Sequence, residues 1–169
     1  KENSPELENA ENVAEKVGIG AILYTFLKNN REKDIVFSWD TMLDFEGESG
    51  PYVQYSYARG KSILRRSNID TNGADFSLLT SDTEYELIKQ LSKYGDAVKA
   101  AADKNEPFYV NRYVTGVAKL FNKFYNSNPI LKSDVPEDVK KARLALVYAS
   151  TLVIKSALGL LGIETVEKM

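Results

Sequence analysis

The chain has 169 residues, of which 43% are hydrophobic and 27% charged, and its formal net charge is −2. This length and apolar content fit one compact domain, and the small net charge gives no overall field for attracting nucleic acid or membrane. Cysteine and histidine are absent. Their absence excludes disulfides, thiolate metal sites and a histidine base, and it agrees with a reducing, cytoplasmic setting. Because the sequence begins at Lys1 without a secretory signal pattern, we expect a piece of a longer protein.

Capping and turn residues predict helices along the first third of the chain. The apolar spacing predicts a helix from Pro5 to about Asn30. Ser38 is placed to cap a short helix that the sequence FEGESG then ends. Gly50 and Pro51 predict the start of the next helix, because proline is favoured in a first helical turn.

The middle of the chain shows one loop followed by two further helix signals. Residues 67–80 are rich in turn-forming residues and lack a period, so we expect a loop there. Ser81 and Glu84 have the spacing of a capping box, and the apolar pattern after them predicts one helix to about Lys104. Pro107 marks the start of another helix. Its apolar stripe consists of Tyr113, Val117, Leu120 and Phe124.

The last predicted helix begins near Pro136 and ends at the glycines Gly159 and Gly162. It is apolar on nearly all sides, but Arg143 and Lys155 lie in or beside the apolar run. We therefore interpret it as a helix at the centre of a bundle and not as a membrane span. No segment shows the alternation of a strand, and the predicted fold is an all-α helical bundle.

A stretch rich in tyrosine and arginine, GPYVQYSYARGKSILRR, occupies residues 50–66. At about 100° per residue, two of its helical faces differ in character. The predicted core face carries Val53, Tyr57, Gly60 and Leu64. The opposite face carries Tyr52, Tyr55, Arg59, Ser62 and Arg66. No acidic residue in this stretch neutralises its cations.

The second face has two interpretations that the pattern leaves open. Aromatic rings beside fixed cations suit unpaired bases on a phosphate backbone. Alternatively, the tyrosines are half-buried packing residues and the arginines an ordinary solvated surface. In that case the chain is a structural bundle that uses this face for protein contact or self-association.

Seven segments give the chain a family resemblance, and they occur in the order GIGAILY, FSWD, FEGESGPYVQYSYAR, EPFYVNRYV, FNKFYN, ARLAL and ALGLLGIETVEKM. In order and spacing they resemble the C-terminal part of class I arginyl-tRNA synthetases, and the resemblance covers essentially the whole chain. FEGESGPYVQY and the LGLLGI ending are its most specific parts. The tetrapeptide Asp-Ala-Leu-Arg, after which the family's DALR anticodon-binding domain is named, does not occur here.

The resemblance implies that residues 45–169 form a DALR-type anticodon-binding bundle. It implies that residues 1–44 contain helices packing against a catalytic domain of the same polypeptide. The complete enzyme would attach L-arginine to its tRNA using ATP and Mg²⁺, and its histidine-rich adenylating signature and lysine loop would lie upstream of Lys1. We therefore expect arginine tRNA as the partner, neither membrane nor DNA, and no cofactor, metal site or catalytic activity in this chain alone.

By the same resemblance, five residues match positions that contact the anticodon. They are Tyr52, Tyr55, Arg59, Tyr125 and the terminal Met169. Tyrosines offer stacking platforms, and a guanidinium can bond a base edge or a phosphate. We expect the anticodon loop to be unstacked on this surface and its bases to be contacted singly.

The chemistry of three further residues suggests roles beside this set. Asn122 lies three residues before Tyr125 on the same helical face, so we expect it to be a second polar contact. Arg65 and Arg66 are assigned to phosphate contact, because nothing in their spacing fixes them on a base edge. Tyr57 has no role in the resemblance.

An enzymatic alternative would depend on the acidic segment DFEGE. It places Asp44, Glu46 and Glu48 in one glycine-containing turn that could bind a cation. Converging partners are not apparent in the sequence, and acidic turns are commonly just solvated. We regard this alternative as the weaker one.

Overall fold

The computed structural model describes residues 9–169 and contains seven α-helices, one 3₁₀ turn and, within those residues, no strand. The elements are α1 (Ala10–Leu27), α2 (Trp39–Met42), α3 (Gly50–Arg66), η1 (Phe76–Leu78), α4 (Asp82–Leu91), α5 (Tyr94–Lys104), α6 (Phe108–Ser127) and α7 (Glu137–Leu160). The all-α prediction is confirmed. The part of the first predicted helix before residue 9 lies outside the described residues.

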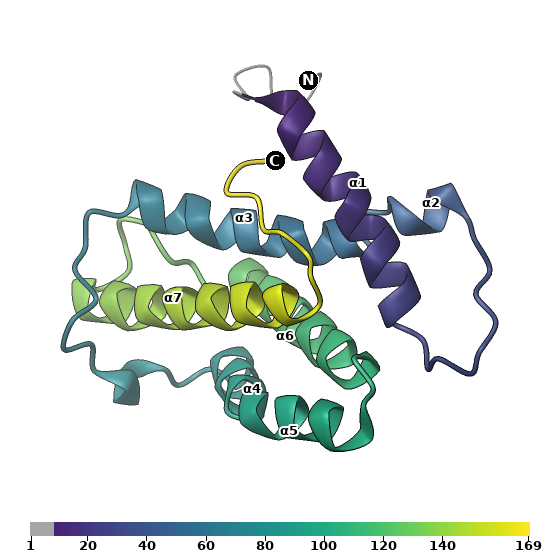
Figure 1. The fold of residues 1–169 in the computed structure, drawn as a ribbon. Coiled ribbons are helices and arrows are strands. Elements are labelled where there is room, and N and C mark those ends of the chain that lie inside the picture. Colours follow the sequence, from purple (N-terminus) through teal and green to yellow (C-terminus); the bar gives the residue numbers. More distant parts are fainter. Residues whose placement is uncertain (1–8) are drawn as a thin grey trace.

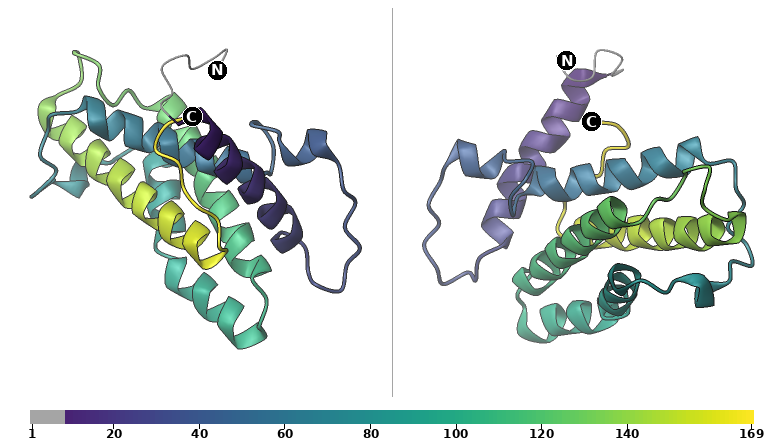
Figure 2. Two further views of the ribbon diagram at one scale, coloured as in Figure 1. Left: turned by 45° about the horizontal axis from the view of Figure 1, so that its top comes forward. Right: turned by 180° about the vertical axis from the view of Figure 1, so that it is seen from behind.

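Helices α3, α6 and α7 form the centre of the bundle (Figure 1). Helices α4 and α5 lie against α6, and α1 crosses the beginning of α3 with α2 beside it. The two views of Figure 2 show the same arrangement from other sides. The central trio therefore brings α3 and α6, which are far apart in the sequence, into direct contact.

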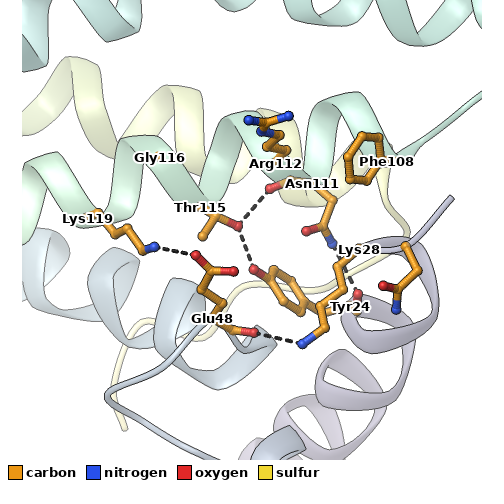
Figure 3. A pocket seen from close by; sticks show the side chains of 10 residues that line it. Tyr24, Lys28, Glu48, Phe108, Asn111, Arg112, Thr115, Gly116 and Lys119 are labelled. Atoms are coloured by element: carbon orange, nitrogen blue, oxygen red, sulfur yellow. Dashed lines mark hydrogen bonds and ion pairs between the residues drawn. The ribbon is translucent and has the colours of Figure 1, made fainter. Parts of the chain in front are cut away.

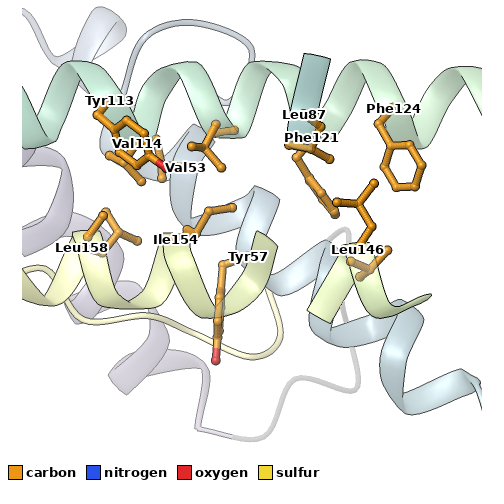
Figure 4. Packing of buried hydrophobic residues seen from close by; sticks show 14 of the residues in the cluster. Val53, Tyr57, Leu87, Tyr113, Val114, Phe121, Phe124, Leu146, Ile154 and Leu158 are labelled. Carbon is orange, nitrogen blue, oxygen red and sulfur yellow. The ribbon is translucent and has the colours of Figure 1, made fainter. Parts of the chain in front are cut away.

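Three of the four predicted core residues of α3 are buried in this trio, whereas Leu64 is half-buried and its neighbour Ile63 is buried instead (Figure 4). Val53 and Tyr57 of α3 pack in one cluster with Phe121 of α6 and Ile154 of α7. Burial of each such side chain is worth about 1.5–3 kcal/mol relative to exposure. Tyr57, which the family resemblance leaves without a role, is thus a core residue.

Gly60, on the predicted core face of α3, lies where this helix packs against α7. A Cβ at this position would collide with the side-chain methyl of Thr151 on α7 and would lie 3.4 Å from the ring of Phe121. A side chain at this position would therefore force Thr151 or the two helices to shift. The absence of a side chain at Gly60 therefore lets α3 and α7 pack closely.

Most predicted helix starts coincide with observed ones. Ser81 and Glu84 form the predicted capping box at the start of α4. Ser38 immediately precedes α2, and Pro107 immediately precedes α6. Pro136 precedes α7, and Gly162, with a φ of 71°, provides the left-handed turn after its end.

The prediction of one helix from Ser81 to Lys104 is wrong, because the segment divides into α4 and α5. The break falls at Ser92, whose hydroxyl donates to the Lys89 carbonyl at 3.0 Å. A serine that bonds locally to the backbone competes with helix continuation. The turn lets the ring of Tyr94 pack against Tyr113 of α6, with centroids 5.7 Å apart.

Helix α7 is long and apolar enough, by length and composition, to cross a membrane, and half of its most apolar window is buried inside the protein. Its contacts are with α3, α6, α4 and η1. Among its fully buried residues are Leu144, Val147 and Ile154. These contacts give α7 the place at the centre of the bundle that its sequence indicates.

Candidate nucleic-acid interface

Helix α3 carries three of the predicted anticodon contacts along one stripe. Tyr52, Tyr55 and Arg59 follow one another at spacings of three and four residues. The hydroxyl of Ser49 accepts a 3.1 Å hydrogen bond from the Tyr52 amide and donates to the carbonyl of Asp44. This cap fixes the start of α3. Tyr55 is 36% exposed, whereas Tyr52 and Arg59 are half-buried.

Arg59 links the rings of two helices in what we call the Tyr55–Arg59–Tyr125 cluster. Its guanidinium carbon lies 4.8 Å from the ring centroid of Tyr55 and 4.8 Å from that of Tyr125. Its Nη2 also donates to the Tyr55 hydroxyl at 3.3 Å. Each cation–π contact at a partly exposed site is worth about 0.5–1 kcal/mol. The cluster therefore gathers a cation and two aromatic rings, from α3 and α6, at one partly exposed position.

Asn122 on α6 is hydrogen-bonded to the same guanidinium. Its Oδ1 accepts from Nη1 of Arg59 at 2.5 Å, and its Nδ2 donates to Oγ of Ser56 at 2.8 Å. Asn122 is 9% exposed. Both ends of the amide are thus engaged within the protein, and a direct base contact by Asn122 would require one of these bonds to break.

Two neighbours of the cluster were missed by the sequence interpretation. Phe45 packs edge-on against Tyr55, with ring centroids 6.5 Å apart. Ser56 is fully buried on α3 and reaches across to Asn122. Neither contact has a local sequence signal, because one partner lies outside the helix and the other lies on a different helix.

The chain end after α7 returns across α3, as the yellow segment of Figure 1 shows. Nε2 of Gln54 donates to the Glu164 carbonyl at 2.7 Å. Arg65 donates to the Glu167 carbonyl at 3.0 Å, and Lys61 pairs with the Glu167 carboxylate at 3.2 Å. These bonds fasten the tail that carries Met169 along α3. A contact of Met169 with a base remains a prediction.

The two arginines assigned to phosphates are exposed at the end of α3. Arg65 is engaged with the tail through Glu167. Arg66 donates from Nη2 to Oγ of Ser62, one turn earlier in its own helix, at 3.2 Å. Their phosphate contacts remain predictions, and for Arg65 the structure adds a part in holding the tail.

A second polar region is a cleft of about 540 Å³ between the end of α1, the loop before α3 and the first half of α6 (Figure 3). Lys119 donates to the Glu48 carboxylate, and this hydrogen bond is the main cause that holds the pKa of Glu48 below its usual range. Burial raises the pKa of Tyr24 to about 12, although its hydroxyl bonds to Thr115 at 2.5 Å. Neither Glu48 nor Tyr24 is poised to exchange a proton near neutral pH.

The acidic segment before α3 does not gather its carboxylates. Oδ1 of Asp44 accepts from the amide of Glu46 at 2.8 Å, while Glu48 turns to Lys119. Within residues 9–169, no group of three or more His, Cys, Asp or Glu is arranged to hold a metal ion. The geometry of this segment therefore gives the enzymatic alternative no support.

Comparison with known families gives one match, to the family described as DALR anticodon binding domain, over residues 53–169. Curated relatives carry the name arginine–tRNA ligase. The protein of Clostridium kluyveri is 56% identical over 99% of this chain and 30% of its own length. The protein of Clostridium botulinum strain 657 is 57% identical, again over 99% of this chain and 30% of its own length. The chain thus spans about 30% of the length of these relatives.

Solved structures give the same picture. Arginyl-tRNA synthetase from Thermus thermophilus superposes with a TM-score of 0.92 at 33% identity, covering 99% of this chain and 29% of that one. The Plasmodium falciparum enzyme superposes with a TM-score of 0.83 at 28% identity, covering 95% of this chain and 28% of that one. The bundle described above is therefore similar to one portion of these larger proteins.

Proposed function

Because the chain belongs to the family of DALR anticodon-binding domains, we propose that it binds the anticodon loop of arginine tRNA. The observation that carries this proposal is the Tyr55–Arg59–Tyr125 cluster, where two rings and a guanidinium meet at a partly exposed site. Unstacked loop bases need stacking surfaces and donors to their edges, and this cluster offers both. The choice of arginine tRNA rests on the similar proteins, which are named arginine–tRNA ligases.

In this proposal, the bases of the loop are unstacked and held one at a time. A base stacks on the face of Tyr55 or Tyr125 that is turned away from Arg59, which is worth about 1–3 kcal/mol per base. Arg59 keeps N–H groups beyond those used on Asn122 and Tyr55, since a guanidinium carries about five. These remaining donors bond a base edge or a phosphate oxygen. Tyr52 and Met169 extend the surface along α3 and its tail.

The larger protein to which the chain belongs would be a cytoplasmic arginine–tRNA ligase that joins L-arginine to its tRNA with ATP and Mg²⁺. Residues 1–44 would lie against its catalytic domain, and residues 45–169 would form the anticodon-binding domain. The apolar side chains before α3 support this boundary. Val36 is 88% exposed and Trp39 is 56% exposed, which suits a surface that another part of the protein covers.

The chain by itself would then form no arginyl-adenylate. Arginine-dependent exchange of pyrophosphate into ATP should stay at background, because the catalytic residues would lie in the remainder of the ligase. Pyrophosphate exchange that stays above background after the chain is purified again would contradict the proposal that the catalytic residues lie in the remainder of the ligase.

The proposal is tested by binding the chain to arginine tRNA and to the same tRNA with its anticodon replaced, at two salt concentrations. We expect tighter binding to the native anticodon, and we expect Tyr55→Ala to remove most of the preference. Phosphate contacts lose affinity as salt rises but cannot distinguish the two RNAs. Equal binding of both RNAs at both salt concentrations would favour the alternative of a structural bundle with a basic patch.

A further inference from the structure

A chain of three hydrogen bonds runs from the backbone of α3 through α6 to Arg59. The hydroxyl of Ser56 donates to the Tyr52 carbonyl at 2.9 Å. Nδ2 of Asn122 donates to Oγ of Ser56 at 2.8 Å, and Nη1 of Arg59 donates to Oδ1 of Asn122 at 2.5 Å. This series of bonds thus begins and ends on α3, but its third member, Asn122, belongs to α6.

The direction of these bonds is fixed by the number of protons available. The single hydroxyl proton of Ser56 is used on the Tyr52 carbonyl, so Oγ faces Asn122 only as an acceptor. The amide of Asn122 must therefore turn its Nδ2 toward Ser56 and its Oδ1 toward Arg59. A reversed amide would place N–H groups against a guanidinium that has no acceptor.

Burial makes this orientation stable. Ser56 is fully buried and Asn122 is 9% exposed, so water has little access to the hydrogen bond between them, whereas the bond from Arg59 to Asn122 is part-buried. A buried amide that loses its partner costs more free energy than one that can turn to water. Ser56 consequently anchors the Nδ2 end of Asn122, and the amide anchored in this way holds one edge of the guanidinium.

The guanidinium of Arg59 is thereby held on three sides. Asn122 engages Nη1, the Tyr55 hydroxyl engages Nη2, and the rings of Tyr55 and Tyr125 lie near its faces. The remaining N–H groups then point in fixed directions before any RNA binds. Fixing a donor in advance favours the one base edge that matches it.

We propose that Asn122 and Ser56 are positioning residues that set anticodon specificity through Arg59 without touching the RNA themselves. This inference rests on the proposed function of the Tyr55–Arg59–Tyr125 cluster. It replaces the sequence-based expectation that Asn122 is itself a base contact. It also gives Ser56, a buried serine without any assigned role, a part in recognition.

The decisive variant is Ser56→Ala, because it leaves every cluster residue chemically intact and alanine is well tolerated in a helix. The measured quantity is the discrimination ratio, defined as the Kd for arginine tRNA with a replaced anticodon divided by the Kd for native arginine tRNA. We expect Ser56→Ala to lower this ratio by roughly fivefold or more, the lower end of what one good base contact supplies. The Kd for the replaced anticodon should not change.

A double-mutant cycle separates positioning from a general structural effect. If Ser56 acts through Arg59, Ser56→Ala causes no further loss of discrimination in an Arg59→Ala background. Asn122→Asp supplies a second check, because a carboxylate accepts in either orientation and needs no help from Ser56. Asn122→Asp should keep more discrimination than Asn122→Ala, and adding Ser56→Ala to it should change nothing.

Two other asparagines of the same region serve as matched controls. Asn126 is exposed one turn after Asn122, and Asn126→Ala should leave both stability and discrimination unchanged. Asn128 is buried and bonds to Thr83 and Ser81. Asn128→Ala should lower the thermal midpoint and leave the discrimination ratio unchanged.

The outcomes are distinguishable. If wild type discriminates between the two RNAs and both Ser56→Ala and Asn122→Ala keep the same discrimination ratio, this inference is overturned and the proposed function stands. The inference would also be overturned if Ser56→Ala lowered the discrimination ratio as much in the Arg59→Ala background as in wild type. A wild-type chain that binds both RNAs equally would instead overturn the proposed function, and this inference with it.

Discussion

The guanidinium carbon of Arg59 lies 4.8 Å from the ring centroid of Tyr125, although the two residues belong to different helices. Their contact depends on the packing of α3 against α6, which in turn depends on the core below. The candidate binding surface and the fold are therefore coupled. Changes that shift α3 relative to α6 should alter the cluster as directly as changes in its own residues.

Replacing Arg59 by lysine should separate charge from geometry. Arg59→Lys keeps a positive charge but loses the planar group that meets Asn122 and both rings. We expect affinity for arginine tRNA to keep its salt dependence while the preference for the native anticodon falls by about 1–3 kcal/mol. Titrations of both RNAs at several salt concentrations measure the two effects separately. An unchanged preference would mean that only the charge at this position matters.

The ring of Tyr125 should matter more than its hydroxyl. Tyr125→Phe keeps the aromatic face beside Arg59, so its affinity for the native anticodon loop should stay close to wild type. Tyr125→Leu removes the face and should cost about 1–3 kcal/mol of binding free energy. Isothermal titration calorimetry with the two variants makes the comparison. Equal losses in both would assign the contribution to the hydroxyl and argue against stacking.

Gly60→Ala should destabilise the fold through the contact between α3 and α7. The added Cβ would collide with the Thr151 methyl group, and such overpacking costs about 1–3 kcal/mol in the free energy of unfolding. Gly95 on α5 is the matched control, because nothing lies within 4 Å of a Cβ there. Because Gly95 lies in the first turn of α5, Gly95→Ala should gain less than the roughly 0.5–1 kcal/mol of a mid-helix exchange and should not destabilise the chain. Urea unfolding measures both, and a neutral Gly60→Ala would show that Thr151 or the two helices can shift at little cost.

Glu84 should make the stability of the bundle fall in acid. Burial opposes its charge, but hydrogen bonds from the Ser81 amide and from Nε of Arg143, at 2.8 and 2.7 Å, keep the net pKa of Glu84 below its usual range. A group with a lowered pKa contributes stability above its unfolded pKa, and this contribution is lost as pH falls through the folded pKa. Stability measured from neutral pH downward should therefore decrease more steeply for wild type than for Glu84→Gln.

Glu84→Gln should also lower the free energy of unfolding at neutral pH. Glu84→Gln leaves the guanidinium of Arg143, which is 15% exposed, without its anionic partner, and breaking such a pair costs about 3 kcal/mol. Glu86, which forms an exposed pair with Lys123, provides the control. Glu86→Gln should cost at most about 1 kcal/mol. Similar midpoints for the two variants in thermal unfolding would contradict the assigned role of Glu84.

Local features of the sequence predicted local features of the structure. The capping box at Ser81 and the burial of Val53 and Tyr57 follow from spacings within one helix. The division of α4 from α5 did not follow, because the apolar pattern continues across the turn at Ser92 and gives no local signal of it. Helical periodicity shows which residues share a face of a helix. A turn that keeps the same residues on that face leaves the pattern unchanged, so the pattern does not reveal the turn.

The candidate site was predictable only in part, for the same reason. Tyr55 and Arg59 share a face of one helix, and the spacing of four residues shows it. The approach of Tyr125 to Arg59 and of Asn122 to Ser56 depends on how two helices pack, which no local spacing encodes. The family resemblance supplied Tyr125, but it could not show that Asn122 faces inward.

The most direct test of the account is the binding of the isolated anticodon stem-loop of arginine tRNA to this chain, compared with a stem-loop of the same stem and a scrambled loop. The stems contribute equal phosphate charge, so the comparison isolates recognition of the loop bases. Wild type should bind the native loop at least roughly fivefold more tightly, and Arg59→Ala should bind both stem-loops equally. Equal binding of the two stem-loops by the wild-type chain would contradict it.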